Sequence, residues 1–320
     1  MRKFFAVLSY PNSNNLGDFI QSIAAKHELN VKEAYELDRD QLHIYNGPKV
    51  FLIMNGWFME EPTNWPPSEK ITPLFLSFHL NPSAKKNMLS DKGISYLKKH
   101  QPIGCRDYYT QNLLSGFGIK TYFSGCLTLT LSRKNFNIKN NQRKGIYLIS
   151  PMERLLPKRE KFLGSYFQKL IMNFKRPLNK IKYLKAIKRL HHFLKDEEEE
   201  IYNISQTIDS VIYSKEKKTE FAEQHLKYIA NAKLVITSRI HSALPAVAFD
   251  TPVLFLSDGL SHINQRSRLD GMNNFFQILN SRDLKNFDLK KIKNTKRHIP
   301  FVNKMRKEII NFKEYKGSSE

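Results

Sequence analysis

The sequence predicts an α/β protein with two Rossmann-like domains that face one another across a cleft. Short apolar runs typical of buried strands alternate with helical patterns in both halves of the chain. Strands separated by helices form parallel sheets that are covered on both faces. A polar, basic stretch at 134–144 separates the halves, and 320 residues suffice for two cores. We therefore expect an N-terminal domain at 1–135 and a C-terminal domain at 145–320.

The N-terminal half is expected to hold five strands and three helices. Each strand is a short apolar run bounded by polar or turn residues, and each helix repeats apolar residues at helical spacing. The expected strands are 4–9, 50–54, 74–78, 102–106 and 120–123, and the expected helices are 18–29, 91–99 and 108–115.

The C-terminal half restarts the same alternation after the basic connection. A basic insertion at about 152–200 interrupts it. The expected strands are 145–149, one near 211–213, 234–237 and 253–256, and the expected helices are 217–230, 242–249 and one near 269–279.

The net charge of +22 is unevenly distributed. Residues 152–195 contain thirteen lysines and arginines but only two glutamates. Such an excess indicates nucleic acid, an anionic membrane surface or acidic substrates as partners. Nucleic acid is the least favoured, because the chain has no helix-turn-helix, zinc-finger or aromatic RNA-binding pattern.

The basic region 169–194 reads as an amphipathic helix that Pro177 interrupts. Such a helix suits the anionic inner face of a bilayer. Alternatively, its apolar side packs on the protein and its lysines are solvated. No apolar stretch is long enough to span a membrane, and two cysteines support neither a disulfide framework nor a cysteine zinc site. We expect a cytoplasmic protein, either free or peripheral at the inner face of the membrane.

The turn after the expected strand 234–237 carries two residues suited to an anion. Arg239 and His241 stand in the run Ser-Arg-Ile-His, where the turn passes into a helix. Ligands of doubly wound proteins bind at such turns, and helix amides with an arginine fork attract phosphate or carboxylate. His241 can transfer a proton near neutral pH. Alternatively, Arg239 is a surface residue and His241 is a buried, hydrogen-bonded histidine.

Four segments spread over most of the chain carry recognisable motifs. Residues 15–18 read Asn-Leu-Gly-Asp, and residues 106–110 read Arg-Asp-Tyr-Tyr-Thr. Residues 238–241 read Ser-Arg-Ile-His, and residues 251–254 read Thr-Pro-Val-Leu. Together they resemble the polysaccharide pyruvyl transferase family, with its Asn-x-Gly-Asp loop, Arg-Asp-x-x-Ser helix, and Ser-Arg-x-His helix followed by a strand.

The resemblance implies a fold similar to the two-domain GT-B glycosyltransferases. It also implies an enzyme that moves a pyruvyl group from phosphoenolpyruvate onto a sugar of a cell-surface polysaccharide or its lipid-linked precursor. The enolpyruvyl carbons become a ketal across two hydroxyls, and phosphate leaves. Phosphoenolpyruvate is a substrate, so neither a cofactor nor a metal is expected. The alternative is a GT-B glycosyltransferase that uses a nucleotide-sugar donor.

Two catalytic residues are expected from these motifs. His241 is the acid or base, and Asp18 holds an acceptor hydroxyl or acts as a base. Alternatively, Asp18 is only the N-cap of the first helix.

The donor carries two acidic groups, which we assign to Arg239 and Arg106. Alternatively, Arg106 and Asp107 form a local ion pair at a helix start. Further substrate contacts are expected from Ser238, Asn15, Gly17, Asn55 and His79, and the loop residues His262, Arg266 and Arg268 are expected to line the cleft.

Overall fold

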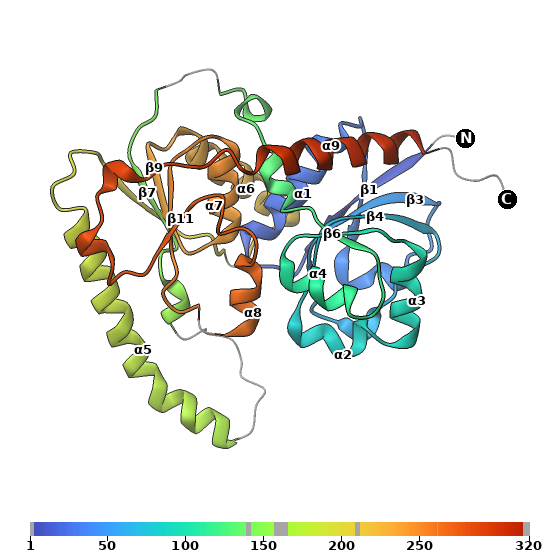
Figure 1. The fold of residues 1–320 in the computed structure, drawn as a ribbon, viewed down its shortest axis with the longest axis horizontal. Helices are drawn as coiled ribbons and strands as arrows, with labels where there is room; N and C mark the ends of the chain where they lie inside the picture. Colours follow the sequence, from blue (N-terminus) through green and yellow to red (C-terminus); the bar gives the residue numbers. More distant parts are fainter. Residues whose placement is uncertain (1–2, 139–141, 157–165, 209–211, 261, 316–320) are drawn as a thin grey trace.

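A computed structural model describes residues 3–138, 142–156, 166–208, 212–260 and 262–315. Within the helix at 166–193, its description of side chains begins at Pro177. Two sheets lie side by side, each with helices packed against it (Figure 1). Every pair of neighbouring strands in both sheets is parallel. The prediction of two Rossmann-like α/β units is confirmed.

The first sheet has six strands in the order β2-β1-β3-β4-β5-β6. Their bounds are β1 Phe4–Ser9, β2 Tyr35–Asp38, β3 Val50–Phe58, β4 Ile71–Leu80, β5 Ile103–Cys105 and β6 Thr121–Phe123. All five predicted strands are present. The edge strand β2 was not predicted, because its sequence Tyr-Glu-Leu-Asp has little apolar character and it is largely exposed.

Three of the four helices described beside the first sheet, α1, α3 and α4, begin with side-chain caps. Asn15 caps α1 by accepting a hydrogen bond from Gly17, and Asp107 caps α4 by accepting one from Thr110. The bounds are α1 Leu16–Leu29, α2 Lys85–Met88, α3 Asp91–Lys99 and α4 Tyr108–Ser115. The alternative in which Asp18 is the cap of α1 is therefore wrong.

The second sheet has five strands in the order β11-β10-β9-β7-β8. The bounds are β7 Ile146–Ile149, β8 Ile201–Ile204, β9 Leu234–Thr237, β10 Val253–Leu256 and β11 Gln277–Leu279, with helices α6 Lys215–Asn231, α7 Ile240–Ala248 and α8 Ile263–Arg266.

Two predictions for the second half are wrong. A strand was expected near 211–213, but Ile212 and Tyr213 lie in a turn, and residue 211 is outside the described residues. The strand of this region is β8, which lies earlier in the chain. The helix expected near 269–279 is replaced by a turn and the strand β11. Gly271 has a φ of +87°, a left-handed conformation that ends a helix.

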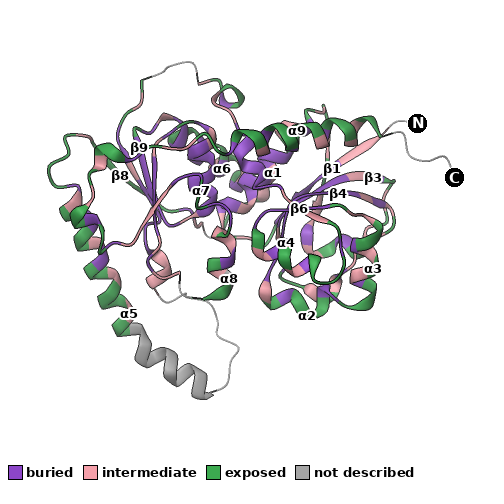
Figure 2. Cartoon of the chain, viewed as in Figure 1, coloured by how far each residue is buried: buried purple, intermediate pink, exposed green. Residues whose placement is uncertain are grey.

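Helix α5, Tyr166–Phe193, lies within the stretch of about 152–200 that was predicted to be a basic insertion. Ala186 and Leu190 of its C-terminal end, with Leu194 just after it, pack on the second sheet. Figure 2 shows the described turns before this end mostly in green, as exposed. The predicted break at Pro177 is wrong, because the helix continues through this residue.

The last helix, α9 Ile299–Glu314, was not predicted and lies over the first half of the chain (Figure 1). The Phe312 ring contacts the Phe51 ring at 5.3 Å, and Arg306 pairs with Glu28 at 3.2 Å. The division into 1–135 and 145–320 stays a prediction, and this packing favours assigning α9 to the first unit.

The two halves share one apolar core where α1 meets α6 and α7. Phe19 and Ile20 of α1 belong to the same buried cluster as Leu226 of α6 and Ala243 of α7. Figure 2 shows this buried zone at the centre of the molecule. The shared core holds the strand ends of both sheets in a defined relation, and the site described next lies there.

Candidate functional site

The predicted and newly found site residues follow the carboxyl ends of strands in both sheets, where doubly wound proteins bind ligands. From the first sheet come His79 at the end of β4 and Arg106 after β5. From the second come Arg239 after β9 and His241 in α7. Three more site residues follow β7, β8 and β10, namely Arg154, Gln206 and Arg268.

His79 and Asp107 form a fully buried pair on the first side of the site. His79 Nδ1 lies 2.5 Å from Asp107 Oδ2. The other oxygen of Asp107 accepts hydrogen bonds from the amide and hydroxyl of Thr110, at 2.9 and 2.8 Å. The carboxylate that caps α4 therefore also fixes the ring of His79.

This pair consists of a neutral imidazole and a carboxylate. Burial lowers the pKa of His79 to about 4, and Arg106 and Arg268 act in the same direction against the attraction of Asp107. Burial alone would raise the pKa of Asp107, but His79 and Arg106 lower it below its ordinary value. Nδ1 then donates to Asp107, which leaves Nε2 with a lone pair. Among the described residues Nε2 has no hydrogen-bond partner.

Arg106 is fully buried beside this pair. Its Nη1 donates to Gln21 Oε1 at 3.4 Å, and its Nε lies 3.7 Å from Asp107 Oδ2. The expected local ion pair therefore exists as a long contact. Nε and Nη2 find no hydrogen-bond partner in the described part of the chain. A buried guanidinium with unmet donors is costly unless an anion completes it.

The second side of the site contributes three more arginines. The side chain of Arg239 is only 19% exposed and pairs with Glu153 at 2.8 Å, so the alternative in which it is a surface residue is wrong. Burial lowers the pKa of Arg154 to about 10, with a further contribution from Arg239. Burial also lowers the pKa of Arg268 to about 9, together with Arg106 and Arg154. These like charges thus lie close enough to disfavour one another.

His241 lies between the two sides and is almost completely buried. Burial lowers its pKa well below the ordinary value, and the charges of Arg106 and Arg268 lower it further. Its Nε2 lacks a hydrogen-bond partner among the residues described. The alternative that His241 is a buried, hydrogen-bonded histidine is thus confirmed for its burial. It is not confirmed for a hydrogen bond at Nε2.

Gly17 and Asn15 hold the start of α1 against the second half. A Cβ atom on Gly17 would lie 2.7 Å from Gln206 Nε2 and 2.8 Å from His241 Nδ1, so only glycine permits this approach. Asn15 Oδ1 accepts hydrogen bonds from Gly17 N at 3.1 Å and Gln206 Nε2 at 2.8 Å. Asp18 accepts a hydrogen bond from Ser13 Oγ at 2.6 Å. The substrate and catalytic roles of these residues stay predictions.

Ser238 and Asn55 are also engaged within the protein. The hydroxyl of Ser238 donates to the carbonyl of Leu256 at 2.6 Å and accepts from the amide of Met152 at 2.8 Å. The amide of Asn55 donates to the carbonyl of Gln21 at 3.0 Å. Its Oδ1 is buried and, within the described ranges, unpartnered. Asn55 thus keeps an atom that can meet a ligand.

A comparison with models of known protein families shows which family the chain belongs to. A model of the family described as polysaccharide pyruvyl transferase matches residues 15–259, which include all of the predicted catalytic and binding residues. The chain belongs to the polysaccharide pyruvyl transferase family. The protein is therefore an enzyme, a pyruvyltransferase, and the family implies a polysaccharide acceptor.

Solved structures resemble this pyruvyltransferase only distantly. An uncharacterised protein of Klebsiella pneumoniae is 12% identical, with 83% of this chain and 87% of that chain covered and a TM-score of 0.45. The UDP-GlcNAc 2-epimerase of Methanocaldococcus jannaschii is 15% identical, with coverages of 98% and 100% and a TM-score of 0.45. The wall teichoic acid polymerase TagF is 13% identical, with coverages of 98% and 84% and a TM-score of 0.40. No curated protein matches the chain.

Two further properties of the pyruvyltransferase concern metals and membranes. In the described residues, no three or more His, Cys, Asp or Glu side chains gather closely enough to hold a metal ion. Likewise, no helix within those residues combines the length and apolar character needed to cross a membrane. Cys105 and Cys126 are both buried and free.

The sequence did not reveal every residue of the pyruvyltransferase site. Arg268 was expected to line the cleft, and its guanidinium does lie near Arg106 and 5.8 Å from the Trp57 ring. Arg154, Glu153 and Gln206 were missed. The first two follow β7 directly, which is a ligand-binding position, but they lie in a stretch that was interpreted as an insertion.

Proposed function

We propose that this pyruvyltransferase takes phosphoenolpyruvate as its donor and forms a ketal on a sugar of a cell-surface polysaccharide or of its lipid-linked precursor, in the cytoplasm. The observation that carries the proposal is the set of buried cationic or imidazole nitrogens without a partner. Near the carboxyl ends of the described strands, these include nitrogens of His79, Arg106, Arg154, Arg239, His241 and Arg268. Such a set suits a small ligand with more than one acidic group.

The two acidic groups of the donor are assigned to two pairs of arginines. Arg106 and Arg268 lie near both site histidines, because the charges of the two guanidinium groups lower the pKa of His79 and the pKa of His241. Arg154 and Arg239 form the second pair. Phosphate and carboxylate both accept the paired donors of a guanidinium. This assignment keeps the predicted donor role of Arg239 and Arg106 and extends it by two residues.

The reaction moves two protons, and each has a donor and an acceptor. The methylene carbon of the donor gains one proton, and the two acceptor hydroxyls each lose one. Two new C–O bonds form at the enol carbon, and its C–O bond to phosphate breaks. The departing phosphate takes the second proton. The enzyme therefore needs a base at the acceptor, an acid at the methylene carbon, and cations for the departing phosphate.

We assign the base to His79 and the acid to His241. Asp107 orients His79, so its unpartnered Nε2 can accept a proton from an acceptor hydroxyl. His241 is held neutral partly by Arg106 and Arg268. A bound anion offsets these charges and raises the pKa of His241, which then carries the proton that the methylene carbon needs. Asp18 keeps its predicted role of holding an acceptor hydroxyl.

A donor screen tests this function. The enzyme is incubated with the depyruvylated polysaccharide and either phosphoenolpyruvate or nucleotide sugars. We expect phosphate release from phosphoenolpyruvate only when the acceptor is present, together with a new ketal methyl signal in the NMR spectrum of the glycan. Nucleotide release from a sugar nucleotide, without consumption of phosphoenolpyruvate, would instead establish the glycosyltransferase alternative.

A further inference from the structure

Helix α5 has two faces of opposite character from Pro177 onward. One face is buried on the second sheet through Ala186, Leu190 and Leu194. Three large apolar side chains lie on the other side and are about half exposed, namely Leu178 at 59%, Ile181 at 48% and Leu184 at 54%. An ordinary amphipathic helix would bury its apolar residues against the protein. These three are exposed, so packing against the described part of the chain does not account for them.

Cations share the exposed face of α5 with the apolar residues. Lys185 and Lys188 lie four residues after Ile181 and Leu184, respectively, and this spacing places side chains on one helical face. Along α5 the three apolar residues come first, with the exposed Lys180 and Lys182 between them, and Lys185 and Lys188 follow nearer the C-terminal end of the helix. We call residues 178–184 the apolar end of this face and residues 185–188 its basic end.

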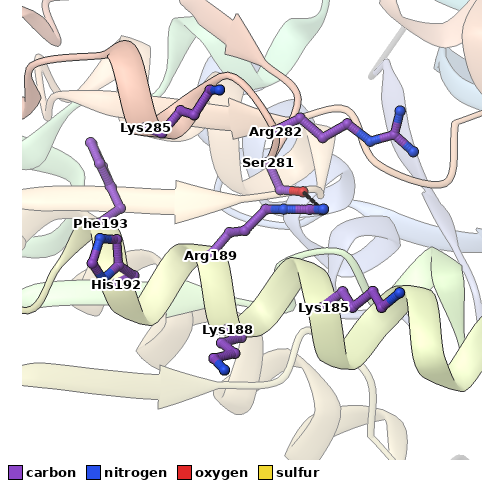
Figure 3. Close-up of a pocket in the computed structure, with 8 residues that line it drawn as sticks. All are labelled: Lys185, Lys188, Arg189, His192, Phe193, Ser281, Arg282 and Lys285. Carbon is purple, nitrogen blue, oxygen red and sulfur yellow. Dashed lines mark hydrogen bonds between the residues drawn. The ribbon is translucent and has the colours of Figure 1, made fainter.

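The basic end opens into a pocket of about 360 Å³ between α5 and the segment after β11. Figure 3 shows the side chains that line it, with Arg189 reaching Ser281 Oγ at 3.5 Å. The lining residues are Lys185, Lys188, Arg189, His192, Phe193, Ser281, Arg282 and Lys285. Five of these carry a positive charge, and none of the described lining residues is acidic. The pocket suits a phosphate group.

We infer that this face of α5 docks on a bilayer that contains anionic phospholipid. Leu178, Ile181 and Leu184 enter the boundary between headgroups and acyl chains, and the pocket receives a phosphodiester headgroup. The combination favours a lipid surface over nucleic acid, because nucleic acid accounts for the cations but not for the exposed aliphatic side chains. Docking of this kind does not depend on which donor the enzyme uses.

Vesicle co-sedimentation tests the inference with the full-length enzyme. Vesicles of phosphatidylcholine alone are compared with vesicles that also contain phosphatidylglycerol. We expect binding only to the anionic vesicles, and weaker binding at high salt. The double change Lys185→Glu and Lys188→Glu should lower the partition coefficient by at least about tenfold.

The apolar end is tested by Leu178→Asp with Ile181→Asp, which should also lower the partition coefficient by about tenfold or more. The matched control for the lysine variant is Lys92→Glu with Lys99→Glu, two exposed lysines of α3 that give the same change in net charge as Lys185→Glu with Lys188→Glu. This control should bind within about twofold of wild type. Activity on a short, water-soluble acceptor should be unchanged in all three variants, which verifies that they fold.

Three outcomes would overturn the inference. The first is wild-type enzyme that does not bind anionic vesicles. The second is equal loss of binding in the α3 control, because net charge alone would then explain the effect. The third is a variant set that loses oligonucleotide binding but keeps vesicle binding, which would assign the basic pocket to nucleic acid. None of these results would alter the donor screen, so failure of docking is distinguishable from failure of the proposed reaction.

Discussion

The two sides of the interdomain site hold their arginines in different ways. Arg106 is fully buried on the first side, between Gln21 and the His79–Asp107 pair, and two of its nitrogens have no partner among the described residues. Arg239 on the second side is 19% exposed and already shares one nitrogen with Glu153. The first side is preorganised and lacks only its anion, whereas the second must exchange one partner for another. We therefore expect substitutions on the first side to have the larger effects.

The largest effect is expected for Arg106→Lys. Lysine offers one point charge where the site holds a planar fork with two unmet N–H groups, and each hydrogen bond to a charged group contributes on the order of 1.5–3 kcal/mol. Donor affinity, measured by calorimetry with phosphoenolpyruvate, should fall by about 10²- to 10³-fold. The matched control is Arg306→Lys, which changes an arginine of α9 that pairs with Glu28 far from the site. Equal affinities in the two variants would remove Arg106 from donor binding.

The next largest effect is expected for Asp107→Asn. The single oxygen of asparagine can still cap α4, but its NH2 group then faces Nδ1 of His79 and can only donate, so the wrong tautomer is favoured. We expect kcat to fall by about 10²- to 10³-fold, whereas the KM for phosphoenolpyruvate changes little. If Asp107 had only a structural role, the Asp107→Asn variant would have a lower melting temperature, and its kcat and KM would change together.

The pH profile of the wild-type enzyme provides a second readout of this pair. With a pKa of about 4, His79 stays unprotonated in the free enzyme down to nearly that pH. The acid limb of kcat/KM should therefore lie well below pH 6.5, the ordinary range of histidine. An acid limb near 6.5 would exclude His79 as the base.

The sequence predicted those site residues whose position is determined by nearby residues in the chain. Arg106, Arg239 and His241 were found because each follows an apolar run directly, and such positions lie at the carboxyl edge of a parallel sheet. The role of Asp107 was not foreseen, because its partner His79 is 28 residues away and only the pairing of β4 with β5 brings the two together.

Elements with weak local signals were also missed. The position of α9 depends on contacts with β3 and α1, which are far away in the sequence. The edge strand β2 is short and exposed, so it has no apolar pattern to detect. The helix expected near 269–279 does not form, because Gly271 adopts a left-handed backbone conformation. The sequence does not reveal this conformation, because it depends on the surrounding fold.

His241→Ala is expected to have an intermediate effect, because this residue lies between the two sides. If it supplies the proton to the methylene carbon, turnover should fall by roughly 100-fold while donor affinity stays within a few-fold of wild type. In the wild-type enzyme, NMR of the imidazole should show a pKa that rises when phosphoenolpyruvate binds. Unchanged turnover in the variant, or a pKa that does not move, would exclude the acid role.

The smallest effect is expected for Glu153→Gln on the adaptable side. Glu153 now accepts a hydrogen bond from Arg239 at 2.8 Å, and an incoming anion competes with this carboxylate. Glutamine removes the competing charge at nearly constant volume, so the KM for phosphoenolpyruvate should fall by about two- to fivefold with kcat unchanged. Glu28→Gln is the matched control, since it neutralises the partner of Arg306 and alters the net charge equally. A rise in KM in Glu153→Gln would mean that the carboxylate positions Arg239 rather than competing for it, and the two sides of the site would then be equally preorganised.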